Sequence, residues 1–323
     1  MDELTSGASY PLLNQRYRLE QQIVSGIHSQ VWKATDTLRG LPVLLKSYLP
    51  AALHDWKHIQ LIEREARVLS QINHIEIPGF VDFFTTGKES EQTLHLVTHW
   101  VNGMTLQDKL DKGWQISEKE VFTLATHVLE LLVYLHAFNP PLVHRDIKPS
   151  NLMINEWGRV YLIDFGGAQE AMPASGTGGS TIVGTLGYMA TEQVYGRAVP
   201  ASDLYSLGVT LLHLLKGKNF SPSDPETHLQ LLEELPMEHS QFKQWFRFLL
   251  APDYRARYQS PEAALKDLDR LQNKVFEERT LFYPQNHKAQ IPEIIHSLTL
   301  TQRDEQTQAL ASGSLLEGRY EIK

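Results

Sequence analysis

The 323-residue sequence has no cysteine, which excludes disulfides, thiolate zinc sites and a cysteine nucleophile. It also lacks any apolar run near the roughly 18 residues that a membrane-spanning helix needs. Its 30 basic and 38 acidic residues leave a net charge of −8, so no basic surface for nucleic acid or a membrane is indicated. The acidic start, MDELTSGASY, lacks the features of a signal peptide. We therefore expect a cytoplasmic protein with no membrane segment and no nucleic-acid partner.

What the sequence does contain is an ordinary globular composition, 42% hydrophobic and 21% charged, in a chain long enough for two lobes. Short apolar or β-branched runs between turn residues predict one helix over about 56–72 and strands at 17–24, 30–36, 41–49 and 94–101. Helical spacing begins with a capping box at Ser117 and Glu120 and recurs near 203–216, 226–235, 240–250 and 261–273. These patterns predict an α+β fold. A small β-rich lobe with one helix covers about 17–101, and a larger, mainly α-helical lobe covers about 102–272.

Three segments fall outside this pattern. Residues 1–16 form an N-terminal extension, and residues 273–323 form a polar tail or linker. Residues 169–184 are rich in Gly, Ser and Thr, and a loop of that length in a compact region is usually functional or disordered. The tail ends in LLEGRYEIK, which shares Leu-Leu, Arg and Tyr in register with LLNQRYRLE at 12–20. Chance, a second copy of the domain and a mimic of its first strand are all open explanations.

The segment LVHRDIKPSN at 142–151 is the richest in chemistry. An apolar run leads into His144, Arg145 and Asp146, and Lys148 and Asn151 follow. Charged residues between apolar segments need partners or a function, because burying an unpaired charge is costly.

A predicted hairpin then brings a second oxygen ligand toward this segment. The strand-like runs LMI and RVYLID flank a turn at 155–158, and the second run ends at Asp164, followed by Phe165 and Gly166. An asparagine and an aspartate brought together in this way form an all-oxygen site suited to Mg²⁺. We therefore predict that Asn151 and Asp164 bind this metal.

Two side chains of opposite charge in the small lobe lie at positions where the sequence pattern predicts buried, apolar residues. Lys46 lies in the strand-like run PVLLKSYL, and Glu65 lies on the apolar stripe of the expected helix, between Ile62 and Leu69. Either charge alone would be expensive to bury, but together they offset one another. The alternative for Lys46 is a lysine at a strand edge whose ammonium group reaches solvent.

The stretch IVSGIHSQVW at 23–32 has the pattern of a β-hairpin around Gly26. A loop that wraps a phosphate usually has several glycines, because backbone N–H groups must approach the anion without a Cβ in the way. Only one glycine is present, so the stretch by itself favours a plain hairpin.

Together, HRDIKPSN, DFG, the strand lysine and the helix glutamate, in this order and spacing, resemble the protein kinase family. The resemblance covers about residues 17–272, and DIKPSN, GTLGYMATEQ and GRAVPASDLYSLG are similar to bacterial, in particular cyanobacterial, eukaryotic-type Ser/Thr protein kinases. It implies a bilobal protein-kinase-like fold that transfers the γ-phosphate of ATP to Ser or Thr hydroxyls of protein substrates, with ATP and Mg²⁺ as cofactors. Autophosphorylation of the activation loop, through self-association, is also implied.

The resemblance gives each matching residue a role. Lys46, oriented by Glu65, would hold the α- and β-phosphates. Asp146 would orient the acceptor hydroxyl and accept its proton, and Lys148 would neutralise the γ-phosphate. The nucleotide and its metal would be bound by Val24, Ser25, Gly26, Ile27, Ser29, Val31, Lys46, the gatekeeper Thr98, the hinge residues His99 and Val101, and the metal ligands Asn151 and Asp164.

Further residues would support the site. Asp203 would brace the catalytic loop through its backbone, and Glu192 with Arg257 would form a buried ion pair at the end of the activation segment. Thr185 matches a family threonine that contacts the catalytic lysine. Arg145 would receive a phosphate carried by the activation loop, on one of Thr177, Ser180 and Thr181.

The sequence departs from the family pattern at two places. Ala190-Thr191-Glu192 replaces Ala-Pro-Glu and keeps the glutamate. Val24 and Ser29 replace the first and third glycines of the phosphate loop, so we expect a loop of reduced adaptability and weak ATP binding. The missing glycines favour one alternative, a pseudokinase that serves as a nucleotide-binding or scaffolding module. The other alternative, a small-molecule phosphotransferase, is disfavoured by the peptide-docking segment GTLGYMATE.

Overall fold

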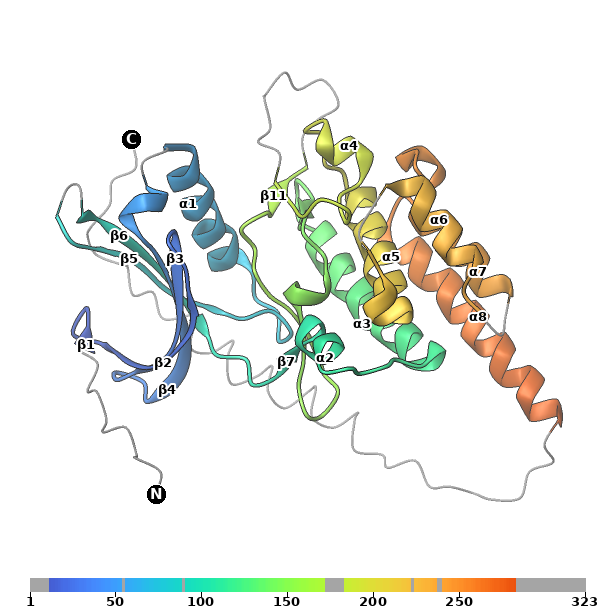
Figure 1. Ribbon diagram of the computed structural model, residues 1–323, viewed down its shortest axis with the longest axis horizontal. Helices are drawn as coiled ribbons and strands as arrows, with labels where there is room; N and C mark the ends of the chain where they lie inside the picture. Colours follow the sequence, from blue (N-terminus) through green and yellow to red (C-terminus); the bar gives the residue numbers. More distant parts are fainter. Residues whose placement is uncertain are drawn as a thin grey trace. The chain divides into compact units, whose positions relative to one another are not determined.

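The computed structural model describes residues 12–53, 56–88, 91–171, 183–221, 224–236 and 240–282 (Figure 1). The chain divides into two units, Met1–Asn273 and Lys274–Lys323. The described part of the second unit, residues 274–282, is the end of one helix. None of the helices in the described residues combines the length and the apolar character that crossing a bilayer would require.

The first part of the chain forms a six-stranded antiparallel sheet with the strand order β1-β2-β3-β4-β6-β5. Its strands are β1 (Leu12–Leu13), β2 (Tyr17–Ser25), β3 (Ser29–Asp36), β4 (Leu41–Tyr48), β5 (Phe80–Thr86) and β6 (Thr93–His99). The 3-10 turn η1 (Pro50–Ala52) and helix α1 (Trp56–Gln71) connect β4 to β5. Figure 1 shows α1 alongside this sheet, and α1 contacts β5.

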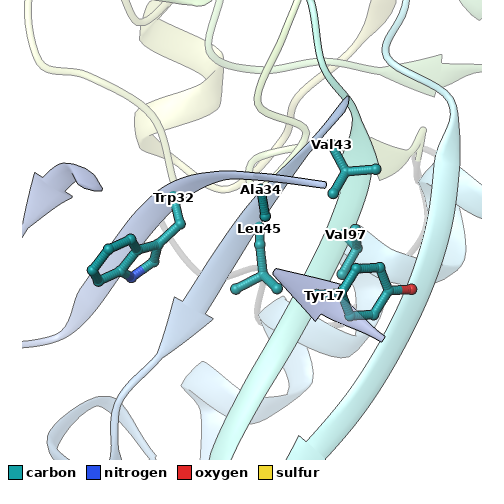
Figure 2. Close-up of a cluster of buried hydrophobic side chains, with 6 residues drawn as sticks. All are labelled: Tyr17, Trp32, Ala34, Val43, Leu45 and Val97. Carbon is teal, nitrogen blue, oxygen red and sulfur yellow. The ribbon is translucent and has the colours of Figure 1, made fainter. Parts of the chain in front are cut away.

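Alternating residues of the central strands form the core of this sheet (Figure 2). Because successive side chains of a strand point to opposite faces, the buried residues of β3 and β4 recur at every second position. The cluster consists of Tyr17, Trp32, Ala34, Val43, Leu45 and Val97. The same alternation places Lys46 and Tyr48 on the opposite face of β4, where both contact Glu65 of α1.

The larger part of the chain is mainly helical. Its longer helices are α3 (Glu118–His136), α5 (Pro200–Lys216), α7 (Ser240–Leu250) and α8 (Pro261–Phe282). Its shorter helices are α2 (Leu106–Asp111), α4 (Thr191–Val194) and α6 (Pro225–Glu233). Helix α5 is buried over most of its length and contacts α3, α6 and α7. Short strands support the site: β7 (Met104–Thr105), β9 (Leu152–Ile154) and β10 (Val160–Leu162) form one sheet, and β8 (Leu142–Val143) pairs with β11 (Gln169–Glu170).

The predicted order of a strand-rich part followed by a helical part is confirmed. The capping box at the start of α3 is also confirmed, because Glu120 N–H donates to Ser117 Oγ (3.3 Å) and Ser117 N–H donates to Glu120 Oε2 (2.8 Å). Strand β5, in which no residue is buried and no clean alternation appears, and the short helix α2 were not predicted.

Two helix boundaries were wrong. Helix α5 begins at Pro200 rather than near Asp203, because its first turn is buried on all sides and shows no helical period. Helix α8 continues to Phe282, although the sequence pattern ended it near Asn273. The segment expected to be an unpatterned tail from residue 273 therefore begins as helix.

The motif Leu-Leu-x-x-Arg-Tyr at 12–17 opens the sheet. Arg16 Nη2 pairs with the buried Asp36 Oδ2 (2.7 Å), and the hydroxyl of the buried Tyr17 donates to Asp82 Oδ2 (2.7 Å). The similar motif at 315–320 lies outside the described residues, as do the candidate phosphate acceptors Thr177, Ser180 and Thr181.

Candidate active site

The catalytic loop, residues 144–151, is fixed to helix α5 through its backbone. Asp203 is fully buried, and its carboxylate accepts the N–H groups of His144 (2.8 Å) and Arg145 (2.8 Å). Arg145 has a left-handed backbone (φ 70°), which is rare for residues other than glycine and is typical of functional sites. The bracing role that the sequence suggested for Asp203 therefore agrees with the geometry.

Three side chains converge on the carboxylate of Asp146. Its Oδ2 accepts hydrogen bonds from Lys148 Nζ (2.7 Å) and Asn151 Nδ2 (2.9 Å), and its Oδ1 accepts one from the hydroxyl of Thr185 (2.8 Å). Lys148 Nζ also donates to Thr185 Oγ1 (2.5 Å), so the activation segment contacts the catalytic loop directly. The side chain of Asp146 is 15% exposed, so a hydroxyl from solution can reach a carboxylate whose orientation is already fixed.

The predicted hairpin after this loop is present as β9 and β10. Asn155 Oδ1 accepts the N–H groups of Trp157 (3.1 Å) and Arg159 (2.9 Å) and so closes the turn. At the other end of the hairpin, Ile163 N–H donates to Asn151 O (2.9 Å). This bond brings the chain next to Asp164 back to Asn151, as expected from the sequence.

Asn151 and Asp164 offer oxygen atoms that fit a divalent cation. Asn151 Nδ2 donates to both the main-chain oxygen (2.8 Å) and Oδ2 (2.9 Å) of Asp146, which leaves its Oδ1 for a ligand. Asp164 Oδ1 accepts from Lys46 Nζ (3.2 Å) and Gly166 N–H (3.3 Å), whereas its Oδ2 accepts no hydrogen bond from a described residue. The positive charge of Lys46 lowers the pKa of Asp164 to about 2, so this carboxylate is ionised at neutral pH.

This pair would need additional ligands that are not side chains. Across the described residues, no group of three or more His, Cys, Asp or Glu side chains is placed to hold a metal. Mg²⁺ usually binds through one or two carboxylate or amide oxygens and completes its shell with water and phosphate oxygens. The oxygen atoms of Asn151 and Asp164 match that coordination preference of Mg²⁺.

The segment after Asp164 is anchored by an aromatic contact. Phe165 is buried and lies edge-on to the ring of His144, with ring centroids 4.8 Å apart. Asp164 itself has a left-handed backbone (φ 64°), so the chain turns sharply between the exposed carboxylate and the buried ring. The contact links the segment Asp164-Phe165-Gly166 to the catalytic loop.

Lys46 lies between two carboxylates. Its Nζ is 3.2 Å from Asp164 Oδ1 and 3.5 Å from Glu65 Oε1. Burial opposes the charge of Lys46, but the carboxylates of Asp164 and Glu65 outweigh it and raise the pKa of Lys46 well above its ordinary value. Glu65 is buried, which raises its own pKa even though Lys46 acts in the opposite direction. The structure therefore has the inward-facing pair, and the strand-edge alternative for Lys46 is wrong.

The phosphate-loop candidate is the hairpin between β2 and β3. Gly26 N–H donates to Ser29 O (3.0 Å), and a Cβ on Gly26 would lie 3.1 Å from that oxygen, so a larger residue fits poorly. Ile27 at the tip is exposed, and Val31 lies opposite Lys46 in the sheet. Val24 lies within β2 opposite Val31 and has no positive φ. Val24 therefore has ordinary extended backbone.

The hinge candidate follows β6. Thr98 is buried opposite Leu44 of β4, and His99 N–H donates to Gly79 O (2.9 Å). The N–H of Val101 donates to no group among the described residues, so it is available to a ligand. This arrangement suits recognition of a flat base by backbone groups.

The end of the activation segment is fixed by a buried ion pair. Arg257 donates to Glu192 Oε1 (2.7 Å) and Oε2 (3.1 Å), and neither side chain is more than 8% exposed. Sequence analysis missed the neighbouring Gln193, whose Nε2 donates to Arg145 O (2.6 Å) and Val183 O (2.8 Å). No sequence pattern marks this glutamine, because it lies in a helix of only four residues.

Two arginines approach each other beside the activation segment. Arg145 Nη1 and Arg64 Nη1 lie 2.5 Å and 3.3 Å from the same atom, Gln169 Oε1. Burial and the nearby charge of Arg64 lower the pKa of Arg145. The side chain expected to receive a loop phosphate is thus joined by a second cation from α1.

The comparisons with known proteins agree with this geometry. The family model for the protein kinase domain matches residues 17–287. The chain belongs to the protein kinase family.

Among curated proteins, similar members of this family are bacterial. Serine/threonine-protein kinase F of Synechocystis sp. is 36% identical over 225 residues, which cover 65% of this chain and 45% of that kinase. Serine/threonine-protein kinase C of the same organism is 35% identical over 236 residues, 67% of this chain and 42% of that kinase. Serine/threonine-protein kinase PknA of Mycobacterium tuberculosis is 36% identical over 210 residues, 64% of this chain and 48% of that kinase. The chain spans under half the length of each of these relatives.

The protein kinase family uses ATP and a divalent metal, and it acts on proteins. The resemblance inferred from HRDIKPSN, DFG, Lys46 and Glu65 is confirmed, and so is the bilobal α+β fold class.

Proposed function

We propose that this chain is an ATP-dependent protein kinase that phosphorylates Ser or Thr hydroxyls of proteins. The observation that carries the proposal is the carboxylate of Asp146, held by Lys148, Asn151 and Thr185 at 2.7–2.9 Å. A carboxylate with both oxygens engaged and one side open to solvent is positioned to receive a proton from an incoming hydroxyl.

In the proposed reaction, Asp146 orients the acceptor hydroxyl and takes its proton. The hydroxyl oxygen then forms a bond to the γ-phosphorus, while the bond from that phosphorus to the β,γ-bridging oxygen breaks and leaves ADP. Lys148 neutralises charge on the transferred group. Lys46, oriented by Glu65, holds the α- and β-phosphates. The residues contribute through position and charge, which dominate catalysis of phosphoryl transfer.

Mg²⁺ is the proposed metal, bound by Asn151 and Asp164. When bound, it neutralises charge on the phosphate oxygens. The low pKa of Asp164 and the unengaged Asn151 Oδ1 support this assignment. The backbone of the hinge, at His99 and Val101, with the gatekeeper Thr98 behind it, would recognise adenine.

The remaining nucleotide contacts come from the phosphate loop. Its backbone from Val24 to Ser29 would cover the phosphates through N–H groups other than that of Gly26, which donates to Ser29 O (3.0 Å), and Val31 would lie under the nucleotide. Only Gly26 is retained from the glycine pattern, so we still expect weak ATP binding. The contacts of Lys46 with Glu65 and Asp164, and of Asp146 with Lys148 and Asn151, support transfer over the pseudokinase alternative.

The wider setting is also part of the proposal. We infer that the protein acts in the cytoplasm on protein substrates, and that two copies associate transiently to phosphorylate each other's activation loops. The convergence of Arg145 and Arg64 near Gln169 supports a phosphate site beside that loop.

A radiolabel assay tests the proposal. The purified chain is incubated with γ-labelled ATP and casein or myelin basic protein, with and without Mg²⁺. We expect label on Ser or Thr of the acceptor only when the metal is present. Absence of label on any protein, together with measurable nucleotide binding, would overturn the kinase proposal in favour of the pseudokinase.

A further inference from the structure

Tyr48 contacts both members of the Lys46–Glu65 pair. It lies two residues after Lys46 on β4, and therefore on the same face of the strand. Its hydroxyl donates to Glu65 Oε2 (2.6 Å), and its ring centroid lies 5.2 Å from the Lys46 ammonium nitrogen. Neither the sequence pattern nor the family motifs single out this tyrosine.

The two oxygens of Glu65 have different partners. Oε1 faces Lys46 Nζ at 3.5 Å, whereas Oε2 accepts the much shorter bond from Tyr48. Lys46 is also closer to Asp164, at 3.2 Å, than to Glu65. The tyrosine hydroxyl is thus the closer partner of this buried carboxylate, and a buried carboxylate is costly when an oxygen lacks a donor. Without that hydroxyl, Oε2 would have no other hydrogen-bond donor among the described residues.

We propose that Tyr48 is a positioning residue that holds Glu65 in the orientation required to direct Lys46 at the nucleotide phosphates. The inference rests on the proposed role of Lys46 in nucleotide binding. The place of Tyr48 in the sheet supports it, because Tyr48 pairs with Ser29 at the end of the phosphate loop. The next residue, Leu49, donates its N–H to His28 O (2.9 Å) and so ties this end of β4 to the same loop.

Tyr48→Phe tests the proposal, since it keeps the ring and removes only the hydroxyl. Affinity is measured with a fluorescent ATP analogue in the absence of acceptor. We expect it to weaken about fivefold, the scale of one net hydrogen bond. KM for ATP should rise by a similar factor, while KM for the acceptor protein stays unchanged.

The matched control is Tyr258→Phe, which removes another tyrosine–carboxylate hydrogen bond, to Asp267 Oδ2 (3.2 Å), far along the chain from Lys46, Glu65 and the phosphate loop. It should leave both KM values and the affinity unchanged. A general loss of packing in Tyr48→Phe would instead alter both KM values, and that result would overturn the positioning role.

A double-mutant cycle with Glu65→Gln separates action through Glu65 from independent action. We expect Tyr48→Phe combined with Glu65→Gln to bind no more weakly than Glu65→Gln alone. Independent effects that multiply, or unchanged affinity in Tyr48→Phe, would overturn the inference. Thermal unfolding is recorded in parallel, and if Tyr48→Phe does not fold, Tyr48→Met, which also lacks the hydroxyl donor, replaces it in the cycle. Since the readout is binding, a wild-type chain that binds nucleotide but transfers no phosphate would refute only the proposed function.

Discussion

Replacing Arg257 with methionine should strongly destabilise the helical part of the chain. The guanidinium group donates to both oxygens of Glu192, at 2.7 and 3.1 Å, and also to the main-chain oxygens of Ala251 (2.6 Å), Ala201 (3.2 Å) and Pro252 (3.0 Å). Methionine fills much of the space but leaves a buried carboxylate without its cation. Breaking a buried pair from one side costs about 3–5 kcal/mol. We expect the free energy of unfolding to fall by that amount, and the melting temperature to fall by roughly 6–20 °C.

The chain offers a matched control for this change. Arg247 pairs with Glu233 at 2.7 Å, the same distance, but the two side chains are 42% and 50% exposed. An exposed pair contributes about 0–1 kcal/mol, so Arg247→Met should be nearly neutral. Urea unfolding of both variants, followed by tryptophan fluorescence, gives the comparison. Equal losses in the two variants would refute the idea that burial of the Arg257–Glu192 pair sets its contribution.

Three further predictions concern the core, the phosphate loop and the activation loop. Burial lowers the pKa of His95, His213 and His228 to about 4, so the stability that each neutral ring contributes is complete above about pH 6.5 and is lost as the pH falls toward 4. The free energy of unfolding, measured with urea, should fall by about 2 kcal/mol per histidine between pH 7.5 and 5, and a flat pH profile would contradict this. The double substitution Val24→Gly, Ser29→Gly should lower KM for ATP several-fold, because smaller residues let the loop N–H groups approach the phosphates; an unchanged KM would mean that the loop is already adequate. Mass spectrometry after incubation with ATP should find phosphate between residues 174 and 181, and an unmodified loop in an active enzyme would rule out autoactivation.

The sequence predicted the ionic part of the site because charges stand out against apolar patterns. Lys46 in an apolar strand and Glu65 on an apolar helix stripe could be paired from their places in those patterns alone. Asn151 and Asp164 followed from a hairpin with a clear turn. In each case a charged or polar residue stood beside apolar segments, and because burying such a group without a partner is costly, the sequence indicated that it had a partner or a function.

Other features had no such signal. Tyr48 is an ordinary strand residue by pattern, and its hydroxyl bond to Glu65 depends on how α1 packs on the sheet. Gln193 acts through a side-chain amide in a four-residue helix. The left-handed backbones of Arg145 and Asp164 occur at residues that rarely adopt them, so only the surrounding structure can enforce them. Strand β5 and the first turn of α5 were missed or misplaced because their burial has no period.

The central claim is that Asp146 serves the acceptor hydroxyl while the nucleotide is bound by other residues. Asp146→Asn keeps the shape of the side chain and can still accept hydrogen bonds, but it removes the base and its charge. Single-turnover transfer of labelled phosphate to an acceptor protein, measured beside the affinity for ATP, tests the claim most directly. We expect the transfer rate to fall by about 10²-fold or more, with the affinity for ATP nearly unchanged. A variant that transfers phosphate at the wild-type rate would contradict the claim.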